Sequence, residues 1–220
     1  MTPPRAASRG VLWDLDGTLV DSGDYHWRSW RDTMRGEGVE LSYQQFLDSF
    51  GQKNDRILTT WMGAAATEDV IRRIGDAKEA LYREFAIAEG LAALPGAAAW
   101  VERLHAAGWK QAIASSAPKE NVRVMLDVLK LDHYFDAIVS AEDVTAGKPD
   151  PQVFLAAAAK LHTPPASCVV VEDAAAGIEA AKRAGMKCVG VSTSSVLPAD
   201  VFVKSLDDLD VDVFEQLVQP

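Results

Sequence analysis

The sequence predicts an α/β fold in which helices cover both faces of a parallel sheet and a helical cap follows the first strand. Short apolar runs alternate with helical patterns along most of the chain, at residues 10–14, 110–114, 137–140, 168–171, 188–191 and 201–203. Residues 20–88 interrupt that alternation, because they contain helical patterns and no convincing strand. We therefore expect a core domain of residues 1–19 and 89–220 and a cap domain of residues 20–88.

Capping residues delimit the helices of this layout. The cap helices are expected at residues 24–37, 42–50, 55–62 and 67–88. The core helices are expected at 96–108, from 118 onwards, at 150–161, at 177–184 and from 205 onwards. Asp150 and Pro151 supply a cap and a first-turn proline to one of them, and Gly185 closes another. Such a sheet binds its ligands at the carboxyl ends of the strands, so the functional residues should follow the strands.

The composition restricts the partners of the protein. A net charge of −10 repels nucleic acid and anionic membranes, so we expect neither as a partner. An acidic protein that acts on an anionic substrate needs local positive charge, from a metal or from a few placed basic residues. Cys168 and Cys188 lie in apolar runs, and two buried, reduced thiols favour a cytoplasmic location. Nothing in the sequence requires more than a monomer.

Two aspartates end the first predicted strand, in the run Val11-Leu12-Trp13-Asp14-Leu15-Asp16-Gly17-Thr18. Side chains at i and i+2 of a strand point to the same face, so Asp14 and Asp16 leave the strand end side by side. Together two such carboxylates can hold a divalent cation and keep one oxygen for nucleophilic attack. The alternative is that Asp16-Gly17 forms only a turn after an edge strand.

Two later strands also end in polar residues. Ser115 and Ser116 precede a helix start, where hydroxyls and backbone N–H groups can cradle a phosphate, although either serine could instead cap the helix. Glu172 and Asp173 follow the strand at 168–171, and acids at the end of so apolar a strand are unfavourable unless they are paired or metal-bound. Asp173 could instead cap the next helix, which would leave Glu172 unexplained.

A lysine stands in a turn between these two strand ends. Lys148 lies between Gly147 and Pro149, in a rigid frame that a flexible surface lysine would not need. Held there, its ammonium could neutralise a carboxylate nucleophile and a phosphoryl oxygen together. The alternative is an ordinary surface turn.

Taken together and in this order, the four motifs resemble those of a known family. With Asp14-Leu15-Asp16-Gly17-Thr18, Ser115, Lys148 and Glu172-Asp173, the chain resembles the haloacid dehalogenase (HAD) superfamily of phosphotransferases from about residue 10 to residue 195. Residues 25–30 and 177–181 make it most similar to the β-phosphoglucomutase branch. The resemblance implies an HAD-like, Rossmann-like core with a helical cap, and a small phosphorylated metabolite as substrate.

The same resemblance implies a mechanism. Asp14 would be the nucleophile that forms an aspartyl-phosphate, and Asp16 would protonate the leaving oxygen and later activate water. Ser115 and Lys148 would bind the transferring phosphoryl group. Mg²⁺ is the implied cofactor, since oxygen ligands suit it and no His/Cys cluster competes. The implied metal ligands are Asp14, Asp16 through its backbone carbonyl, Glu172 and Asp173.

Cap residues separate the two activities that share this core. The family's mutases place an arginine where this sequence has Asn54 and a serine-lysine pair where it has Ala117-Pro118, although Arg56, Lys53 or Lys119 could replace that second phosphate contact. We therefore predict a phosphatase for a small sugar or polyol phosphate, with a mutase and an idle binding protein as alternatives. Trp30 could also be simply a core residue of the cap. The predicted substrate-binding residues are Thr18, His26, Trp30, Gly51, Asn54 and Ser116.

Overall fold

The computed structural model describes residues 8–49 and 51–218 and confirms the predicted fold class. One six-stranded sheet has the order β3-β2-β1-β4-β5-β6, and every neighbouring pair in it is parallel. The strands are β1 (Gly10–Trp13), β2 (Lys110–Ala114), β3 (Ala137–Val139), β4 (Cys168–Glu172), β5 (Lys187–Val191) and β6 (Val201–Val203). Because β1 lies between β2 and β4, residues that follow these three strands meet at one edge of the sheet.

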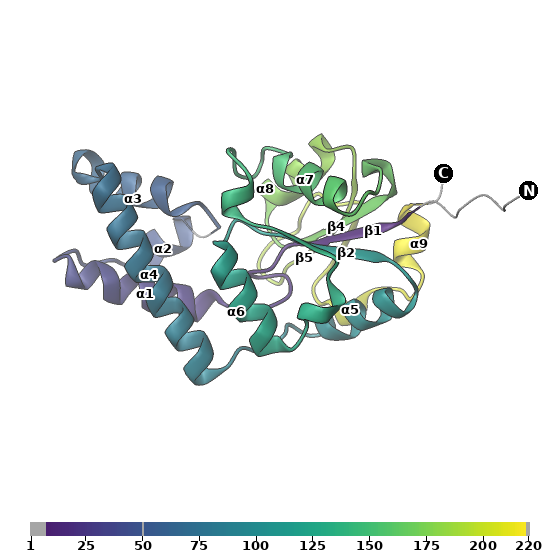
Figure 1. Ribbon diagram of the computed structural model, residues 1–220, viewed down its shortest axis with the longest axis horizontal. Helices are drawn as coiled ribbons and strands as arrows, with labels where there is room; N and C mark the ends of the chain where they lie inside the picture. The colour runs from purple at the N-terminus through teal and green to yellow at the C-terminus, as the bar shows by residue number, and fades with distance from the viewer. Residues whose placement is uncertain (1–7, 50, 219–220) are drawn as a thin grey trace, which may run out of the picture.

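Helices cover both faces of the sheet, with α5 and α6 on one side and α7 and α8 on the other (Figure 1). Alternate residues of each strand pack into the two layers: Val11 and Trp13 join one buried cluster, and Leu12 joins the other. The core helices are α5 (Ala97–Ala106), α6 (Lys119–Leu129), α7 (Gln152–Lys160), α8 (Ala175–Arg183) and α9 (Val213–Leu217).

Four helices form the block that follows β1, and they lie at the left of Figure 1. They are α1 (Gly23–Gly36), α2 (Tyr43–Ser49), α3 (Asn54–Met62) and α4 (Glu68–Glu89). A separate buried cluster holds them together, made of Trp30, Met34, Leu41, Phe46, Ile57, Leu58 and Ile74. The chain enters and leaves this block at one place, because Leu94 N–H donates to Leu19 O at 2.9 Å and Val20 pairs with Ala93 in an antiparallel bridge. This agrees with the predicted cap, whose boundaries at residues 20 and 88 stay a prediction.

The last predicted helix was placed wrongly. Ser205 starts a single 3-10 turn, Leu206–Asp208, and its hydroxyl accepts from Asp207 N–H at 3.2 Å. Leu209 then adopts an extended conformation that ends the turn, so α9 begins only at Val213. At the start of α7, Asp150 accepts from Gln152 N–H at 3.0 Å, but the N-cap residue is Pro151 and not Asp150, so this helix begins one residue later than predicted. The final residue of the predicted second cap helix, residue 50, lies outside the described residues.

Both cysteines are buried and free, as predicted. Burial raises the pKa of Cys168 to about 12 and that of Cys188 to about 11. We therefore expect neither thiol of the native protein to react with a disulfide reagent at pH 8, while both react fully in denaturant. A time course of thiol labelling with and without urea measures this. Rapid labelling of the native protein would instead show that β4 and β5 open readily.

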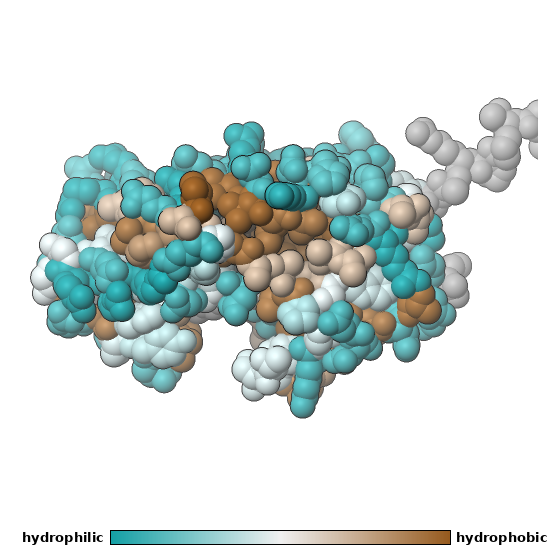
Figure 2. Space-filling view, turned by 90° about the horizontal axis from the view of Figure 1, so that it is seen from below, coloured by the Kyte–Doolittle hydropathy of each residue, from teal (hydrophilic) through white to brown (hydrophobic). Residues whose placement is uncertain are grey.

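Hydrophilic residues cover most of the face shown in Figure 2, and hydrophobic residues gather near its middle. Within residues 8–49 and 51–218, no helix has both the length and the apolar character to cross a bilayer.

Candidate active site

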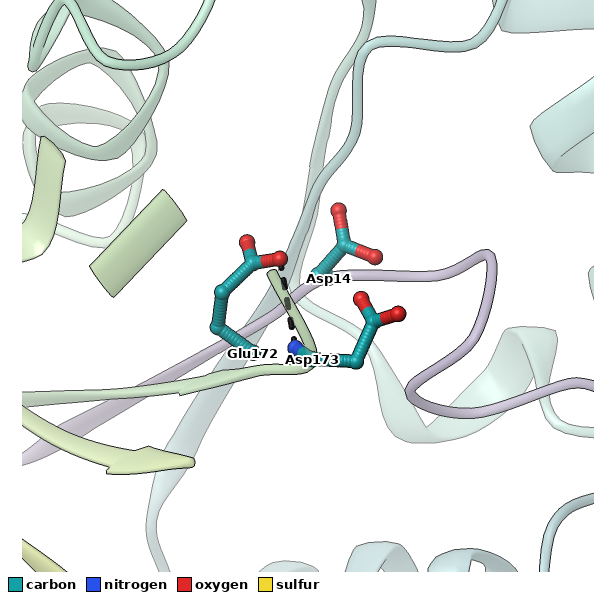
Figure 3. Close-up of side chains that lie close together, drawn as sticks. All are labelled: Asp14, Glu172 and Asp173. Atoms are coloured by element: carbon teal, nitrogen blue, oxygen red, sulfur yellow. Dashed lines mark hydrogen bonds between the residues drawn. The ribbon is translucent and has the colours of Figure 1, made fainter. Parts of the chain in front are cut away.

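Three carboxylates meet where β1 and β4 end. Trp13 pairs with Val171 in the sheet, and Asp14 N–H donates to Val171 O at 3.0 Å, so the residues after both strands leave the sheet together. Figure 3 shows Asp14, Glu172 and Asp173 around a common space, the first from the end of β1 and the other two from the end of β4. One oxygen of each lies within 4.8 Å of the others, which is close enough for all three to bind one cation.

Lys148 supplies the positive charge of this cluster. Its Nζ lies 2.5 Å from Asp14 Oδ1 and 2.6 Å from Glu172 Oε2, and its side chain is only 10% exposed. Burial lowers the pKa of Lys148, but the two carboxylates raise it by more, so the group stays an ammonium at any physiological pH. The turn that carries Lys148 is thus not an ordinary surface turn, because it directs the side chain inward.

One ammonium cannot neutralise three carboxylates. Burial raises the pKa of Asp14 well above its ordinary value, and the neighbouring Glu172 raises it further. Burial and Glu172 likewise raise the pKa of Asp173 to about 7. A divalent cation among these oxygens would relieve that repulsion, and a cluster made only of carboxylate oxygens fits a hard cation such as Mg²⁺.

The loop after β1 is shaped around Asp173. Gly17 has a φ of +84°, and a Cβ there would lie 2.2 Å from Asp173 Oδ2. Thr18 is fully buried, and its hydroxyl donates to Asp173 Oδ1 at 3.3 Å. Asp16-Gly17 therefore does form a turn, but a turn that brings the loop against a carboxylate. Thr18, predicted to bind substrate, positions Asp173 in this structure and is not among the residues lining the cleft.

Glu172 binds the backbone of the two residues that precede α8. Its Oε1 accepts from the N–H groups of Asp173 at 3.2 Å and Ala174 at 3.1 Å, the first of which is drawn in Figure 3. Ala174 is the N-cap residue, and within the part of the chain described no side chain caps this helix. The helix-capping alternative for Asp173 is therefore wrong, and these two hydrogen bonds explain why a glutamate stands at position 172.

Gly177 makes room for that glutamate, because a Cβ on this residue would lie 2.0 Å from the Glu172 carboxyl group. Gly177→Ala should lower the free energy of unfolding by about 2 kcal/mol, although alanine is the better helix former. Urea denaturation measures this, with Gly36→Ala in α1 as control. Gly36 has no atom within 4 Å of the position of its Cβ, so that change should be neutral or mildly stabilising. Equal effects of the two substitutions would contradict the prediction.

Asp16 faces the cap and not the carboxylate cluster. Its Oδ1 accepts from the Ser22 hydroxyl and from His26 Nε2 at 3.1 Å. Lys78 Nζ lies 2.9 Å from His26 Nδ1, and since an ammonium only donates, Nδ1 accepts and the ring proton is on Nε2. Burial raises the pKa of Asp16, but His26, Ser22 and Lys78 together lower it below its ordinary value. Any role of Asp16 as a metal ligand rests on its backbone carbonyl.

The sequence did not identify Ser22 or Lys78 as members of this chain of hydrogen bonds. Lys78 is 2% exposed and lies on the same helical face as the buried residues Ile74 and Tyr82. A lysine at a position where the 3.6-residue period demands an apolar side chain was the available signal. Ser22 carries no comparable signal.

Ser115 and Ser116 both line the cleft at the end of β2. Ser115 is 1% exposed, and its Oγ accepts from Ala117 N–H at 3.0 Å. The N-cap residue of α6 is Pro118, and the first N–H of the helix, that of Lys119, donates to the Glu142 carboxylate, so neither serine is the helix cap. Both hydroxyls lie where they could bind a phosphoryl group near the start of α6.

A cleft of about 510 Å³ separates the cap from the core. The cap contributes the predicted residues His26, Trp30, Gly51 and Asn54 to its wall. Trp30 is only 2% exposed and packs edge-to-face against Trp61, with the two ring centroids 5.1 Å apart. It therefore belongs to the cap core as well as to the cleft. Other lining residues were not among the predicted site residues, including Lys53, Lys78 and Glu79.

Comparison with known proteins identifies the family that carries this site. Residues 11–191 match the family model of haloacid dehalogenase-like hydrolases. The chain belongs to this family. The resemblance drawn from the motifs is thereby confirmed.

Individual relatives of this HAD hydrolase differ in name. It is 30% identical over 213 residues to the validoxylamine A 7′-phosphate phosphatase of Streptomyces hygroscopicus subsp. limoneus, covering 90% of this chain and 94% of that protein. It is 37% identical over 190 residues to the protein SUPPRESSOR OF QUENCHING 1, chloroplastic, of Arabidopsis thaliana, where the match covers 84% of this chain but only 18% of that protein. The crystal structure of β-phosphoglucomutase from Clostridium difficile superposes with a TM-score of 0.85 at 25% identity, covering 96% of this chain and 97% of that chain.

Proposed function

We propose that this HAD hydrolase is a Mg²⁺-dependent phosphatase that hydrolyses a small sugar or polyol phosphate through an aspartyl-phosphate on Asp14. One observation carries the proposal: Lys148 Nζ touches both Asp14 and Glu172 beside a carboxylate cluster that can hold a cation. A carboxylate is a poor nucleophile towards an anionic phosphate until positive charge offsets their repulsion. This cluster provides both the nucleophile and the means to offset it.

The proposed reaction has two steps. Asp14 attacks phosphorus, the bond from phosphorus to the substrate oxygen breaks, and Asp16 gives that oxygen its proton. Asp16 then takes a proton from water as the water attacks the aspartyl-phosphate, which releases phosphate and restores Asp14. Ser115 and Lys148 hold the phosphoryl oxygens through both steps. When bound by Asp14, Glu172, Asp173 and the Asp16 carbonyl, Mg²⁺ would supply the further positive charge.

The surroundings of Asp16 support its dual role. His26 and Ser22 stabilise the carboxylate, which is the form that accepts a proton from water. An incoming phosphate monoester brings negative charge close to Asp16, and a like charge raises a carboxyl pKa. Binding of substrate therefore favours the protonated form that the first step needs.

Asn54 favours hydrolysis over a mutase reaction, because it is an amide at the position where the family's mutases place an arginine. One named relative is a phosphatase and the superposed structure is a β-phosphoglucomutase, so relatives of both kinds share this fold. The proposal takes the enzyme to be a cytoplasmic monomer, as the buried reduced thiols and the composition favour.

Phosphorus NMR of the purified protein with Mg²⁺ and a set of sugar and polyol phosphates tests the proposal. The set includes β-glucose 1-phosphate primed with glucose 1,6-bisphosphate. We expect inorganic phosphate to appear from one or more monophosphates. Rapid conversion to glucose 6-phosphate with little free phosphate would identify a mutase, and no reaction with any compound would favour a binding protein.

A further inference from the structure

A buried carboxylate lies in the cap wall of the cleft. Glu79 on α4 is 6% exposed and lines the cleft. Its Oε1 accepts from Lys78 Nζ at 2.9 Å and from Asn54 Nδ2 at 2.7 Å, and its Oε2 accepts from Asn121 Nδ2 at 2.5 Å. Burial raises the pKa of Glu79, but Lys78 and Asn54 lower it by more, so the group is ionised at neutral pH. None of these contacts has a part in the proposed chemistry at Asp14.

The carboxylate orients the two amides that bind it. Because a carboxylate only accepts hydrogen bonds, the nitrogen of each amide must face Glu79. The Asn121 oxygen then accepts from Arg83 Nη1 at 2.8 Å. Asn54, which also lines the cleft, keeps its side-chain oxygen as a further acceptor in the same wall. Glu79 and Asn54 together thus favour ligand groups that donate hydrogen bonds.

The cations near this wall already have partners. Lys78 is 2% exposed and shared between Glu79 and His26. Arg83 contacts Asn121 and, at 3.3 Å, Glu120. Lys53 Nζ lies 3.4 Å from Ala141 O and 3.3 Å from Val144 O, where it connects the cap to the core.

Among the described residues that line the cap side of the cleft, one further cation is Arg56. It is exposed, follows the acidic residue Asp55, and also borders a depression on the outer face of α3 and α4. A phosphoryl group seated against Glu79 would therefore meet a buried carboxylate whose own cation, Lys78, is already shared between Glu79 and His26.

We propose that Glu79 is a specificity-determining residue: with Asn54 it makes the cap wall an acceptor surface that selects monophosphates rich in hydroxyl or ammonium groups. Compounds that place a second phosphoryl group at that wall are disfavoured, because phosphoryl oxygens only accept hydrogen bonds and would face the acceptor oxygens of Glu79 and Asn54, while Lys78 is already paired with Glu79. The inference rests on the proposed phosphatase function and deepens it. It also separates hydrolysis from mutase chemistry in this chain, because a mutase must hold a bisphosphate in the same cleft.

The test compares two ligands that differ by one phosphoryl group. Inhibition constants of glucose 6-phosphate and glucose 1,6-bisphosphate are measured against Mg²⁺-dependent hydrolysis of p-nitrophenyl phosphate by the full chain. Glu79→Gln keeps the size of the side chain and removes its charge, and it should shift the ratio of the two constants at least about tenfold towards the bisphosphate. Glu79→Asp keeps the charge and should keep the preference for the monophosphate. Glu84→Gln, exposed on the same helix, is the matched control and should leave the ratio unchanged.

Asn54→Arg provides a second measurement that leaves Glu79 in place. It adds a cation to the same wall and should also shift the ratio towards the bisphosphate by about tenfold. An unchanged ratio in both Glu79→Gln and Asn54→Arg would overturn the inference, as would an equal loss of affinity for both ligands, which indicates packing alone. Failure of the unmodified protein to hydrolyse p-nitrophenyl phosphate and every sugar phosphate would overturn the proposed function and this inference with it.

Discussion

Asp14→Asn should reduce kcat for phosphate release by at least about a thousandfold, because it removes the only oxygen proposed to attack phosphorus. An amide is isosteric with the carboxylate but is not a nucleophile at neutral pH. The loss should not come from unfolding, since the substitution removes one of three crowded negative charges in the cluster. Phosphate release and thermal denaturation, measured on the same preparations with Mg²⁺, give both quantities.

Asp21→Asn is the matched control for this prediction. Asp21 is exposed, lies a few residues after Asp14 and has the same chemistry, so its substitution should leave the rate within about twofold of the original. Full activity in Asp14→Asn would remove Asp14 from the mechanism. Equal losses in both variants would point to a general effect of charge near the cleft.

Asp173→Asn should have opposite effects on stability and on activity. In the folded, metal-free protein the pKa of Asp173 is about 7, above the value of about 4 expected in the unfolded chain. Its ionisation therefore opposes folding: this penalty is absent below about pH 4, grows between pH 4 and 7, and is complete above pH 7. With the metal chelated, the variant should be more stable than the original by about 2 kcal/mol at pH 8 and equally stable near pH 4.

With Mg²⁺ present, the same variant should lose both stabilisation by the ion and most of its activity. Removing a charged ligand weakens cation binding, so we expect hydrolysis to fall at least about a hundredfold. Urea denaturation at pH 4.5 and 8, with chelator and with Mg²⁺, separates the two effects. If the variant and the original differed in stability by the same amount at pH 4.5 and pH 8, the raised pKa assigned to Asp173 would be contradicted. Lys148 cannot cause a difference between these two pH values, because its ammonium does not titrate in this range.

The core of the site could be predicted from the sequence because parallel strands impose their own geometry. Polar residues at the carboxyl ends of β1, β2 and β4 lie at the same edge of the sheet, so Asp14, Ser115 and Glu172 could be placed in one site once the strands were recognised. Lys148 could be added because its turn is framed by Gly147 and Pro149.

The cap side of the site could be predicted only in part. A helical pattern shows which face of α4 is buried but not which residue of another element that face meets, so Lys78 and Glu79 gave no sign of their partners in α1 and α6. Thr18 was predicted to bind substrate, and in the structure it is buried and donates a hydrogen bond to Asp173, a contact that the sequence did not predict. The final helix was placed too early because Ser205 caps a 3-10 turn with the same chemistry that it would use in an α-helix.

The paired linkers at Leu19–Val20 and Ala93–Leu94 make the cap an exchangeable part. Since the chain leaves and returns to the core at adjacent points, the core requires of any inserted segment only that its two ends lie together. A longer, shorter or differently folded insertion would leave the strand order and the positions of Asp14 and Glu172 unchanged. Changes in the cap can therefore alter the wall of the cleft while the strand ends that carry Asp14 and Glu172 stay as they are.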